Sequence, residues 1–416
     1  MVKLAVLGAG SRGMTYAREG VLSGRGVVTA IAEPRADRRA AAAAELGVAP
    51  ERAVADWHDL LALPDLDVDA VVVATPDRQH TEPALAFLER RLPLLLEKPM
   101  APTEDEAAQI VAAAERAGVV VCVAHVLRYS PYTQVVKERI AAGAVGDVVS
   151  VEHLEPVGWW HQAHSYVRGN WRREDTSSPM LLAKCCHDVD WLSDVVGRPA
   201  VRVSSFGSLS HFRPENRPEG AADRCLSCAV EPGCPYSAKK IYLDHVHEEA
   251  AQRWPLSVLA SEVTEESITR ALEEGPYGRC VYACDNDVVD HQVVNIEYAG
   301  GITASLTMTA FTPMGFRRTR VFGTRGTLEG DGYTVSVYDF LTGATTTTQV
   351  VDPADPLAGE GHLGADAALT RSFLAAVAED DPSKVLTSPA TSLHTHATVW
   401  AAERARHRGT VEPVPS

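Results

Sequence analysis

The chain has 416 residues, a length typical of two or three domains. Hydrophobic residues make up 45% of the sequence and charged residues 23%, which excludes a mainly disordered chain. The formal net charge of −16 indicates an acidic surface, so we expect neither nucleic acid nor an anionic membrane as a partner. We see no signal peptide at the start and no apolar run of the roughly 20 residues that a membrane helix needs, so we expect a cytoplasmic protein.

The first third of the chain alternates apolar runs with Ala-rich helical segments. Strands are expected at Val2–Leu7, 27–32, 69–74, Leu94–Leu96 and 119–124. Helices are expected between them, at 35–46, 82–90 and Glu104–Ala117. Continuous β-branched strands that alternate with helices are typical of a parallel sheet with helices on both faces. We therefore predict an α/β class fold that begins with a doubly wound domain over residues 1–124.

The pattern changes after about residue 125, where longer runs of alternating hydrophobicity begin. These runs are 147–155, 201–208, 291–299, 301–311, 318–323, 327–331 and 333–338. Gly300 and Gly301 between two of the runs predict a tight hairpin, and 335–338 with 345–351 predicts another. We expect a second α/β domain over 125–365 with a large, open, mainly antiparallel sheet. A cysteine-bearing insertion is expected at about 213–285, and a helical segment over 366–416 that packs back on the domains.

A glycine-rich motif follows the first predicted strand. Gly8, Gly10 and Gly13 form a GxGxxG pattern at the start of a predicted helix, where the backbone can approach a pyrophosphate. Ser11 and Arg12 lie within this motif. Glu33 ends the second predicted strand, where a carboxylate accepts hydrogen bonds from ribose hydroxyls and repels a 2′-phosphate. The pattern predicts NAD binding and favours NAD over NADP, although Arg35 nearby could hold a phosphate.

Further polar residues follow the third and fourth predicted strands. In a doubly wound sheet, ligands bind beyond the carboxyl ends of the strands. The residues expected on this binding side of the sheet are Thr75, Pro76, Asp77, His80, Glu97 and Lys98. Pro99 favours an extended backbone at Lys98, which can direct the amine into the cleft.

The chain resembles the glucose–fructose oxidoreductase and inositol dehydrogenase (Gfo/Idh/MocA) family. The residues that carry the resemblance are the 8–13 fingerprint, the Ala74-Thr75-Pro76 turn with His80, the Glu97-Lys98-Pro99 turn, and Arg128-Tyr129-Ser130-Pro131. The resemblance implies an N-terminal Rossmann domain, a C-terminal α/β domain, a tightly held nicotinamide cofactor, and a sugar or polyol substrate. It also implies a homodimer or homotetramer formed through the large sheet.

The family has an aspartate and, four residues later, a histidine that handle the hydroxyl proton together with the lysine. His187 matches that histidine, but Ala183 stands in the position of the aspartate. The resemblance therefore implies Lys98 and His187 as catalytic residues. Lys184 is an additional basic group that we expect to take part in catalysis and to contact substrate, and Asp188 or Asp190 could replace the missing carboxylate in space.

Residues 159–173 are rich in aromatic and cationic side chains. Aromatic faces pack against sugar rings, and arginine or histidine donors bind hydroxyls and anions. An ordinary loop or an oligomer contact explains this composition equally well. The residues expected at the substrate are Tyr129, Trp160, His161, His164, Arg168, Trp171, Arg172, Lys184, Asp188 and His291. The cations favour an anionic sugar as substrate.

Five of the eight cysteines fall in two groups within the predicted insertion. Cys225 and Cys228 form a CxxC motif, followed by Cys234, and either Cys280 or Cys284 supplies a fourth thiol. This set predicts a structural zinc site, because four thiolates complete a tetrahedral shell. An iron–sulfur cluster and free buried thiols remain alternatives.

The leading functional hypothesis is an NAD-dependent dehydrogenase that oxidises a sugar, polyol or anionic sugar derivative by hydride transfer to nicotinamide. The alternative is a redox-neutral NAD-dependent glycosidase, on sulfoquinovosides or other anionic glycosides, which oxidises the sugar, eliminates the aglycone, adds water and reduces the product. A nucleotide-binding regulator without catalysis is a third reading, which Lys98 and His187 disfavour.

Overall fold

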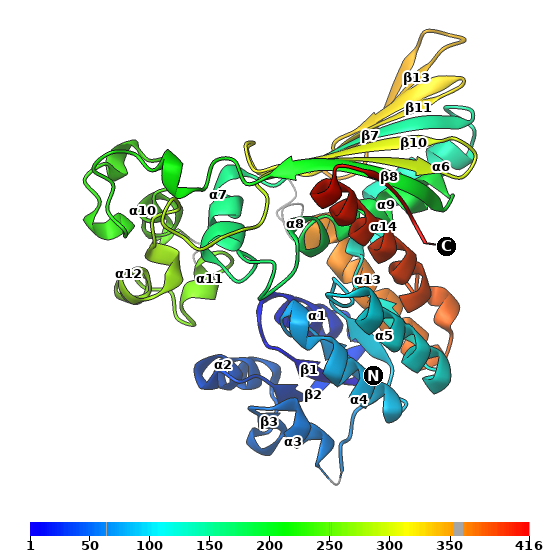
Figure 1. The fold of residues 1–416 in the computed structure, drawn as a ribbon. Helices are drawn as coiled ribbons and strands as arrows, with labels where there is room; N and C mark the ends of the chain where they lie inside the picture. Colours follow the sequence, from blue (N-terminus) through cyan, green and yellow to red (C-terminus); the bar gives the residue numbers. More distant parts are fainter. Residues whose placement is uncertain (64, 249, 251, 353–360, 416) are drawn as a thin grey trace.

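The computed structural model describes residues 1–63, 65–248, 250, 252–352 and 361–415. Two sheets organise the molecule, and a lobe of short helices lies beside them (Figure 1). The predicted α/β class, with one parallel sheet and one large mainly antiparallel sheet, is confirmed. None of the helices in the described residues is both long and apolar enough to span a bilayer.

The first sheet has six parallel strands in the order β3-β2-β1-β4-β5-β6. Its strands are β1 (Val2–Leu7), β2 (Gly26–Ala32), β3 (Ala53–Val54), β4 (Ala70–Val73), β5 (Leu94–Leu96) and β6 (Val121–Val123). Its helices are α1 (Ser11–Leu22), α2 (Ala36–Leu46), α3 (Trp57–Leu61), α4 (Thr81–Glu89) and α5 (Glu104–Ala117). The strands are almost wholly buried, because helices cover both faces.

The second sheet has nine strands in the order β14-β13-β12-β11-β7-β10-β9-β8-β15. Its strands are β7 (Val148–Pro156), β8 (Ala200–Ser208), β9 (His291–Tyr298), β10 (Thr303–Thr309), β11 (Arg318–Gly323), β12 (Gly326–Gly330), β13 (Thr334–Asp339), β14 (Thr345–Gln349) and β15 (Val411–Pro413). Only β7 and β10 pair in parallel. Both predicted hairpins form: β9 pairs antiparallel with β10 across Gly300 and Gly301, which have positive φ, and β13 pairs with β14.

A layer of helices lies between the large sheet and the first domain (Figure 1). These are α6 (Pro131–Ala141), α8 (Met180–Ala183), α9 (Cys186–Val196), α13 (Gly361–Glu379) and α14 (Pro389–Arg408). The last helix, α14, packs against β8 of the large sheet and α5 of the first domain, whereas α13 packs against α1. The chain end therefore joins the two sheets around the site described below.

The described residues between 209 and 290 form most of a separate lobe with its own apolar core (Figure 1). Its helices are α10 (Ala238–Ile241), α11 (Leu256–Leu259) and α12 (Glu265–Glu274). The aromatic segment 159–173 joins this lobe as α7 (Trp159–His161) and a π-helical turn (Gln162–Arg168). Aromatic side chains of both segments pack together, as Trp160 and Trp254 do at a ring separation of 5.1 Å.

Candidate active site

The glycine motif forms the tight turn between β1 and α1. Gly8 has a φ of +88°, and a Cβ there would lie 2.5 Å from the Ala74 carbonyl oxygen. A Cβ on Gly13 would lie 2.0 Å from the Gly8 oxygen, so helix and turn pack too closely for any side chain. The N-terminus of α1, with Ser11 as its first residue, opens beyond Gly10. This cradle fits the pyrophosphate of a dinucleotide, and a bound nicotinamide would supply the hydride acceptor.

Glu33 is buried at the end of β2, where it contacts the glycine turn. Its carboxylate accepts hydrogen bonds from the backbone N–H groups of Ala9, at 2.9 Å, and Arg35, at 3.0 Å. The Arg35 side chain is paired with Asp37 at 2.8 Å. Arg38 instead lies nearest to Gly10, with its guanidinium 3.7 Å from the position of a Cβ there. Arg38 is therefore a cation beside the phosphate cradle, and the sequence reasoning missed it.

Arg12 holds three elements together and is not free to bind phosphate. Its Nε lies 2.6 Å from Glu97, and its terminal nitrogens bind Asp366 on α13 at 2.5 and 3.1 Å. Tyr16 donates to the same Glu97 oxygen at 2.6 Å. Burial alone would raise the pKa of Glu97, but the positive charges of Arg12 and Lys98 have the larger combined effect. The net pKa of Glu97 is therefore lowered, and the carboxylate stays ionised.

The turns after β4 and β5 are tied together by His80. Its two ring nitrogens face the carbonyl oxygens of Thr75 and Pro99, at 2.8 and 2.7 Å. Thr75 in turn donates to the Gln79 oxygen, and Pro76 begins the short helical turn between them. His80 therefore fixes the Glu97-Lys98-Pro99 turn, whose Lys98 amine donates to the carbonyl oxygen of Ala183 at the end of α8.

His187 lies in the first turn of α9, and its Nδ1 is buried without a hydrogen-bond partner. Its ring centre is 6.0 Å from that of His125 and 5.7 Å from that of His362. Burial and the positive charge of Lys98 hold the pKa of His187 well below its usual range. The imidazole is therefore neutral near pH 7 and available to accept a proton.

Neither Asp188 nor Asp190 directly replaces the carboxylate that the family has at the position of Ala183. Asp188 is fully buried and binds Arg317 at 2.8 Å and His153 at 3.0 Å, so it is not exposed to substrate. Asp190 forms a buried pair with Arg128 at 2.6 Å. Both carboxylates are buried, and each already has a cationic partner.

A buried carboxylate that the sequence reasoning missed, Glu155, lies beside Lys184. The Lys184 amine is 3.4 Å from Glu155, and Arg317 is 2.6 Å from the same carboxylate. The charge of Lys184 also reaches His161, where it adds to burial in lowering the pKa of that histidine. Glu155 ends a strand and Arg317 precedes one, so neither carries a local motif that a single sequence reveals.

The aromatic segment is only partly placed at this site. Trp171 donates to Asp77 at 3.1 Å, and Ser178 donates to the same carboxylate at 2.7 Å, which attaches the segment to the first domain. The rings of His161 and His164 pack on Trp254 at 4.9 and 5.3 Å. His164 also shares a hydrogen bond of 2.9 Å with the Tyr242 hydroxyl.

Four residues expected at the substrate have other environments. Tyr129 is buried, and its hydroxyl shares a hydrogen bond of 3.0 Å with the Thr387 hydroxyl. Arg168 is fully buried in the lobe, where it binds carbonyl oxygens. Arg172 pairs with Asp285 at 3.0 Å, the His291 ring nitrogen Nδ1 is hydrogen-bonded to Asp290 at 2.8 Å, and His291 lines a surface hollow of the large sheet.

Models of an oxidoreductase family match the chain in two blocks: an NAD-binding Rossmann fold over residues 2–125 and a C-terminal alpha/beta domain over residues 137–410. Inositol 2-dehydrogenase 1 of Saccharopolyspora erythraea is 37% identical over 156 residues, which cover 36% of this chain and 44% of that protein. The 2,7-anhydro-N-acetylneuraminate hydratase of Escherichia coli is 27% identical over 148 residues, covering 35% and 39%.

Levoglucosan dehydrogenase, solved in complex with NADH and levoglucosan, superposes with a TM-score of 0.73 over 100% of both chains. Its identity is 19%, so this likeness shows the shared fold. Alignments with curated relatives span 39% to 66% of those relatives' lengths. Because the two family models together match nearly the whole chain, the resemblance is confirmed: the chain belongs to the NAD-binding oxidoreductase family of glucose–fructose oxidoreductase and inositol dehydrogenase.

Proposed function

We propose that the protein is an NAD-dependent dehydrogenase that oxidises a secondary hydroxyl of a sugar or polyol. The observation that carries this proposal is His187: a buried, neutral imidazole with an unpartnered Nδ1, close enough to Lys98 for the amine to lower its pKa. Lys98 follows β5 at the carboxyl edge of the sheet that carries the dinucleotide cradle, and His187 comes from α9 of the second domain. A relative named as an inositol dehydrogenase supports a polyol substrate.

Each residue would have a separate task in this reaction. The substrate hydroxyl would donate its proton to His187 while the carbon that carries this hydroxyl loses a hydride to the cofactor. The Lys98 amine would turn from the Ala183 oxygen to the substrate oxygen and stabilise the developing negative charge. Glu155 would orient Lys184, and its charge offsets part of the surrounding positive charge.

The structure favours a neutral substrate over an anionic one. The sequence-based expectation of an anion relied on the arginines of segment 159–173. Arg168 is buried in the lobe, Arg172 is paired with Asp285, and Arg173 is paired with Asp175 at 2.5 Å. Arg317 is neutralised by Glu155 and Asp188. We therefore propose a neutral polyol or sugar.

A redox-neutral reaction is the second candidate. One relative is named as a hydratase, and the addition of water is in itself a redox-neutral reaction. In this chain Lys184 and Glu155 form a buried acid–base pair near the site in addition to Lys98 and His187. Such a pair could protonate a leaving group after transient oxidation, which a simple dehydrogenase does not require.

The experiment mixes the purified protein and NAD with a panel of free sugars, polyols and aryl glycosides, both neutral and anionic, and follows NADH and released aglycone together. NADH with a neutral sugar or polyol, without aglycone release, is the expected result. Aglycone release without net NADH would replace this proposal with the redox-neutral reaction. Nucleotide binding without turnover of any panel member would favour a regulator and contradict both.

A further inference from the structure

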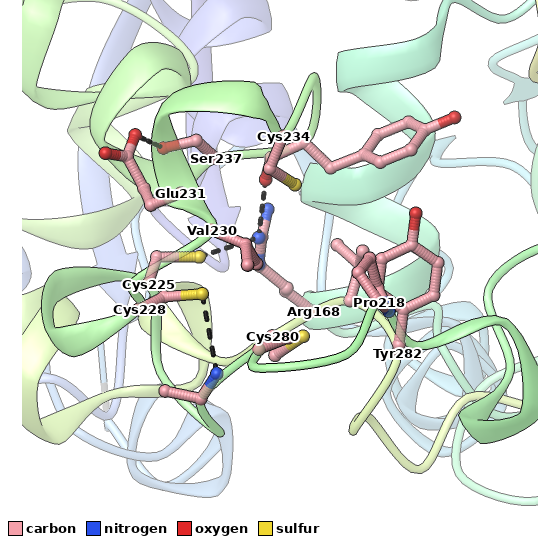
Figure 2. Close-up of a pocket in the computed structure, with 14 residues that line it drawn as sticks. Arg168, Pro218, Cys225, Cys228, Val230, Glu231, Cys234, Ser237, Cys280 and Tyr282 are labelled. Carbon is pink, nitrogen blue, oxygen red and sulfur yellow. Dashed lines mark hydrogen bonds between the residues drawn. The ribbon is translucent and has the colours of Figure 1, made fainter.

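Four cysteines of the lobe line one small cavity (Figure 2). Cys225 and Cys228 lie at the two ends of a short 3-10 turn, Cys234 follows a second such turn, and Cys280 comes from a distant part of the chain. The cavity measures about 20 Å³. This volume holds a single water molecule or ion and excludes a metabolite.

Arg168 enters the same cavity with an uncompensated charge. Its side chain is fully buried, yet the described residues contain no carboxylate within ion-pair distance of it. It donates to the carbonyl oxygens of Tyr236, at 2.7 Å, and Arg279, at 2.8 Å, while its Nη1 has no hydrogen-bond partner. A buried guanidinium without a counter-charge is costly, so this group points to an anionic partner in the cavity.

The sulfur atoms are the groups placed to provide that negative charge. Arg168 lies 3.5 Å from the Cys225 sulfur, and Figure 2 shows its guanidinium between Cys225 and Cys234. The two carbonyls that it binds are next to Cys280 and two residues from Cys234 in sequence. The backbone N–H of Ala222 donates to the Cys228 sulfur at 3.4 Å, an arrangement that favours a thiolate.

We propose that Cys225, Cys228, Cys234 and Cys280 bind one structural zinc ion and that Arg168 is its charge partner. Four thiols would release four protons, and the four thiolates with Zn²⁺ carry a net charge of about −2, which the guanidinium offsets in part. Cys284 is not a ligand, because it does not line the cavity and its sulfur donates to the Cys280 carbonyl at 3.3 Å.

Zinc binding requires the four cysteine sulfur atoms to move closer to one another. Sulfurs bound at about 2.3 Å to one zinc lie about 3.8 Å from each other. In the described residues, the one set of three or more possible ligands within 4.8 Å of one another is Glu174, Glu403 and His407. That set already holds Arg406, which lies 2.6 Å from Glu403 and 3.1 Å from Glu174. The cysteine side chains must therefore rotate inward on binding.

The test measures metal in the full-length protein purified without added chelator. We expect about one zinc per chain, and after exchange with Co²⁺ we expect the charge-transfer and visible bands of a tetrathiolate site. Cys280→Ser should lose this zinc, whereas the matched variant Cys284→Ser should keep it. Arg168→Met should weaken zinc affinity, measured by competition with a chromophoric chelator, by about tenfold or more.

A second measurement covers the case in which Cys280→Ser does not fold. In the wild-type protein, cysteine alkylation followed by mass spectrometry should show the four proposed ligands protected until zinc is removed. Equal zinc in both cysteine variants, bound iron with sulfide, a disulfide among these cysteines, or no metal in the wild type after growth with zinc would each overturn the proposal. These outcomes do not depend on the dehydrogenase activity.

Discussion

In the proposed reaction, Lys98 would contribute a positive charge at the position where a substrate alkoxide forms. In Lys98→Met the side chain keeps nearly its length but loses the donor to the Ala183 oxygen and to substrate. We expect kcat to fall about 100-fold or more while NADH still binds in a titration of its fluorescence. Lys384→Met removes an exposed pair with Glu379 and serves as the control. Unchanged turnover in Lys98→Met would contradict the assignment.

His187 determines the expected pH dependence of the reaction. A general base must be neutral, and burial together with Lys98 lowers the pKa of His187 well below 6.5. The neutral fraction is therefore retained as the pH falls through 6.5 and is lost only at lower pH. We expect kcat/KM for the free enzyme to stay level down to at least about pH 6. An acid limb centred at or above pH 6.5 that disappears in His187→Gln would show that this pKa is not lowered.

Glu33 should set the cofactor preference. Its carboxylate lies between the glycine turn and Arg35, where the negative charge would repel the 2′-phosphate of NADP. Glu33→Gln keeps the shape and one acceptor but removes the charge, and Arg38 remains beside Gly10. We expect the ratio of kcat/KM for NADP over NAD to rise about tenfold, equivalent to about 1.4 kcal/mol. An unchanged ratio, measured beside the control Glu51→Gln, would mean that Glu33 does not discriminate between the 2′-hydroxyl of NAD and the 2′-phosphate of NADP.

The sequence was informative at residue level where a motif is local. The glycine motif, Glu33 and the Glu97-Lys98-Pro99 turn are adjacent in sequence to the strand ends that position them. Asp188 could not be assigned, because its partners Arg317 and His153 come from other parts of the chain. Glu155, Arg38 and Asp366 were missed for the same reason: each acquires a role only through long-range packing.

At the level of elements, Arg12 joins α1, the turn after β5, and α13. Removing its guanidinium leaves Glu97 and Asp366 buried without their common cation. We expect Arg12→Met to lower the free energy of unfolding by about 3–5 kcal/mol, measured by urea denaturation. Arg18→Met, on the same helix, breaks an exposed pair with Glu45 and should cost less than about 1 kcal/mol. Equal effects of the two variants would contradict the linking role of Arg12.

Hydrophobic periodicity predicted the strands and hairpins well, because one or both faces of each are buried. It missed β3 and β15, which have two and three residues, and it gave no sign of the π-helical turn Gln162–Arg168. Because β15 pairs with β8, the chain end is not the wholly helical segment that we expected. The π-helical turn depends on Gly169, where a Cβ would lie 2.7 Å from the His164 carbonyl oxygen. Such an approach is set by packing against the lobe and has no signature in local composition.

For the whole molecule, the domain limits at 124, 213–285 and 366 and the homodimer or homotetramer stay predictions. Figure 1 shows helices on one face of the nine-stranded sheet, with the other face open. Phe206 on that sheet is 68% exposed. This open face is where the family resemblance implies contact between copies.

Buried neutral histidines connect the separate parts of the molecule and should make its stability depend on pH. His396 on α14 donates through Nδ1 to the Ser392 oxygen, at 2.6 Å, and accepts through Nε2 from the Met100 N–H, at 3.0 Å. If Nε2 were protonated, its N–H and the Met100 N–H would be two donors facing each other. Burial lowers the pKa to about 3 for His396, and also for His125 and His164.

Because these histidines remain neutral in the folded state, only the unfolded chain takes up their protons as the pH falls below about 6.5, and stability is lost in that direction. These three groups alone should lower the free energy of unfolding by about 4 kcal/mol between about pH 7 and pH 5.5, above the range where carboxylates titrate. His161 and His187, whose pKa values are also held well below the usual range, add to this decrease. In His396→Gln, whose amide can replace the donor and the acceptor, the decrease should be smaller by about 1 kcal/mol. His58→Gln is the control, because His58 is exposed and Asp56 raises its pKa, which gives the opposite sign. A pH dependence that is the same in the wild type and His396→Gln would show that the pKa of His396 is not lowered in the folded protein.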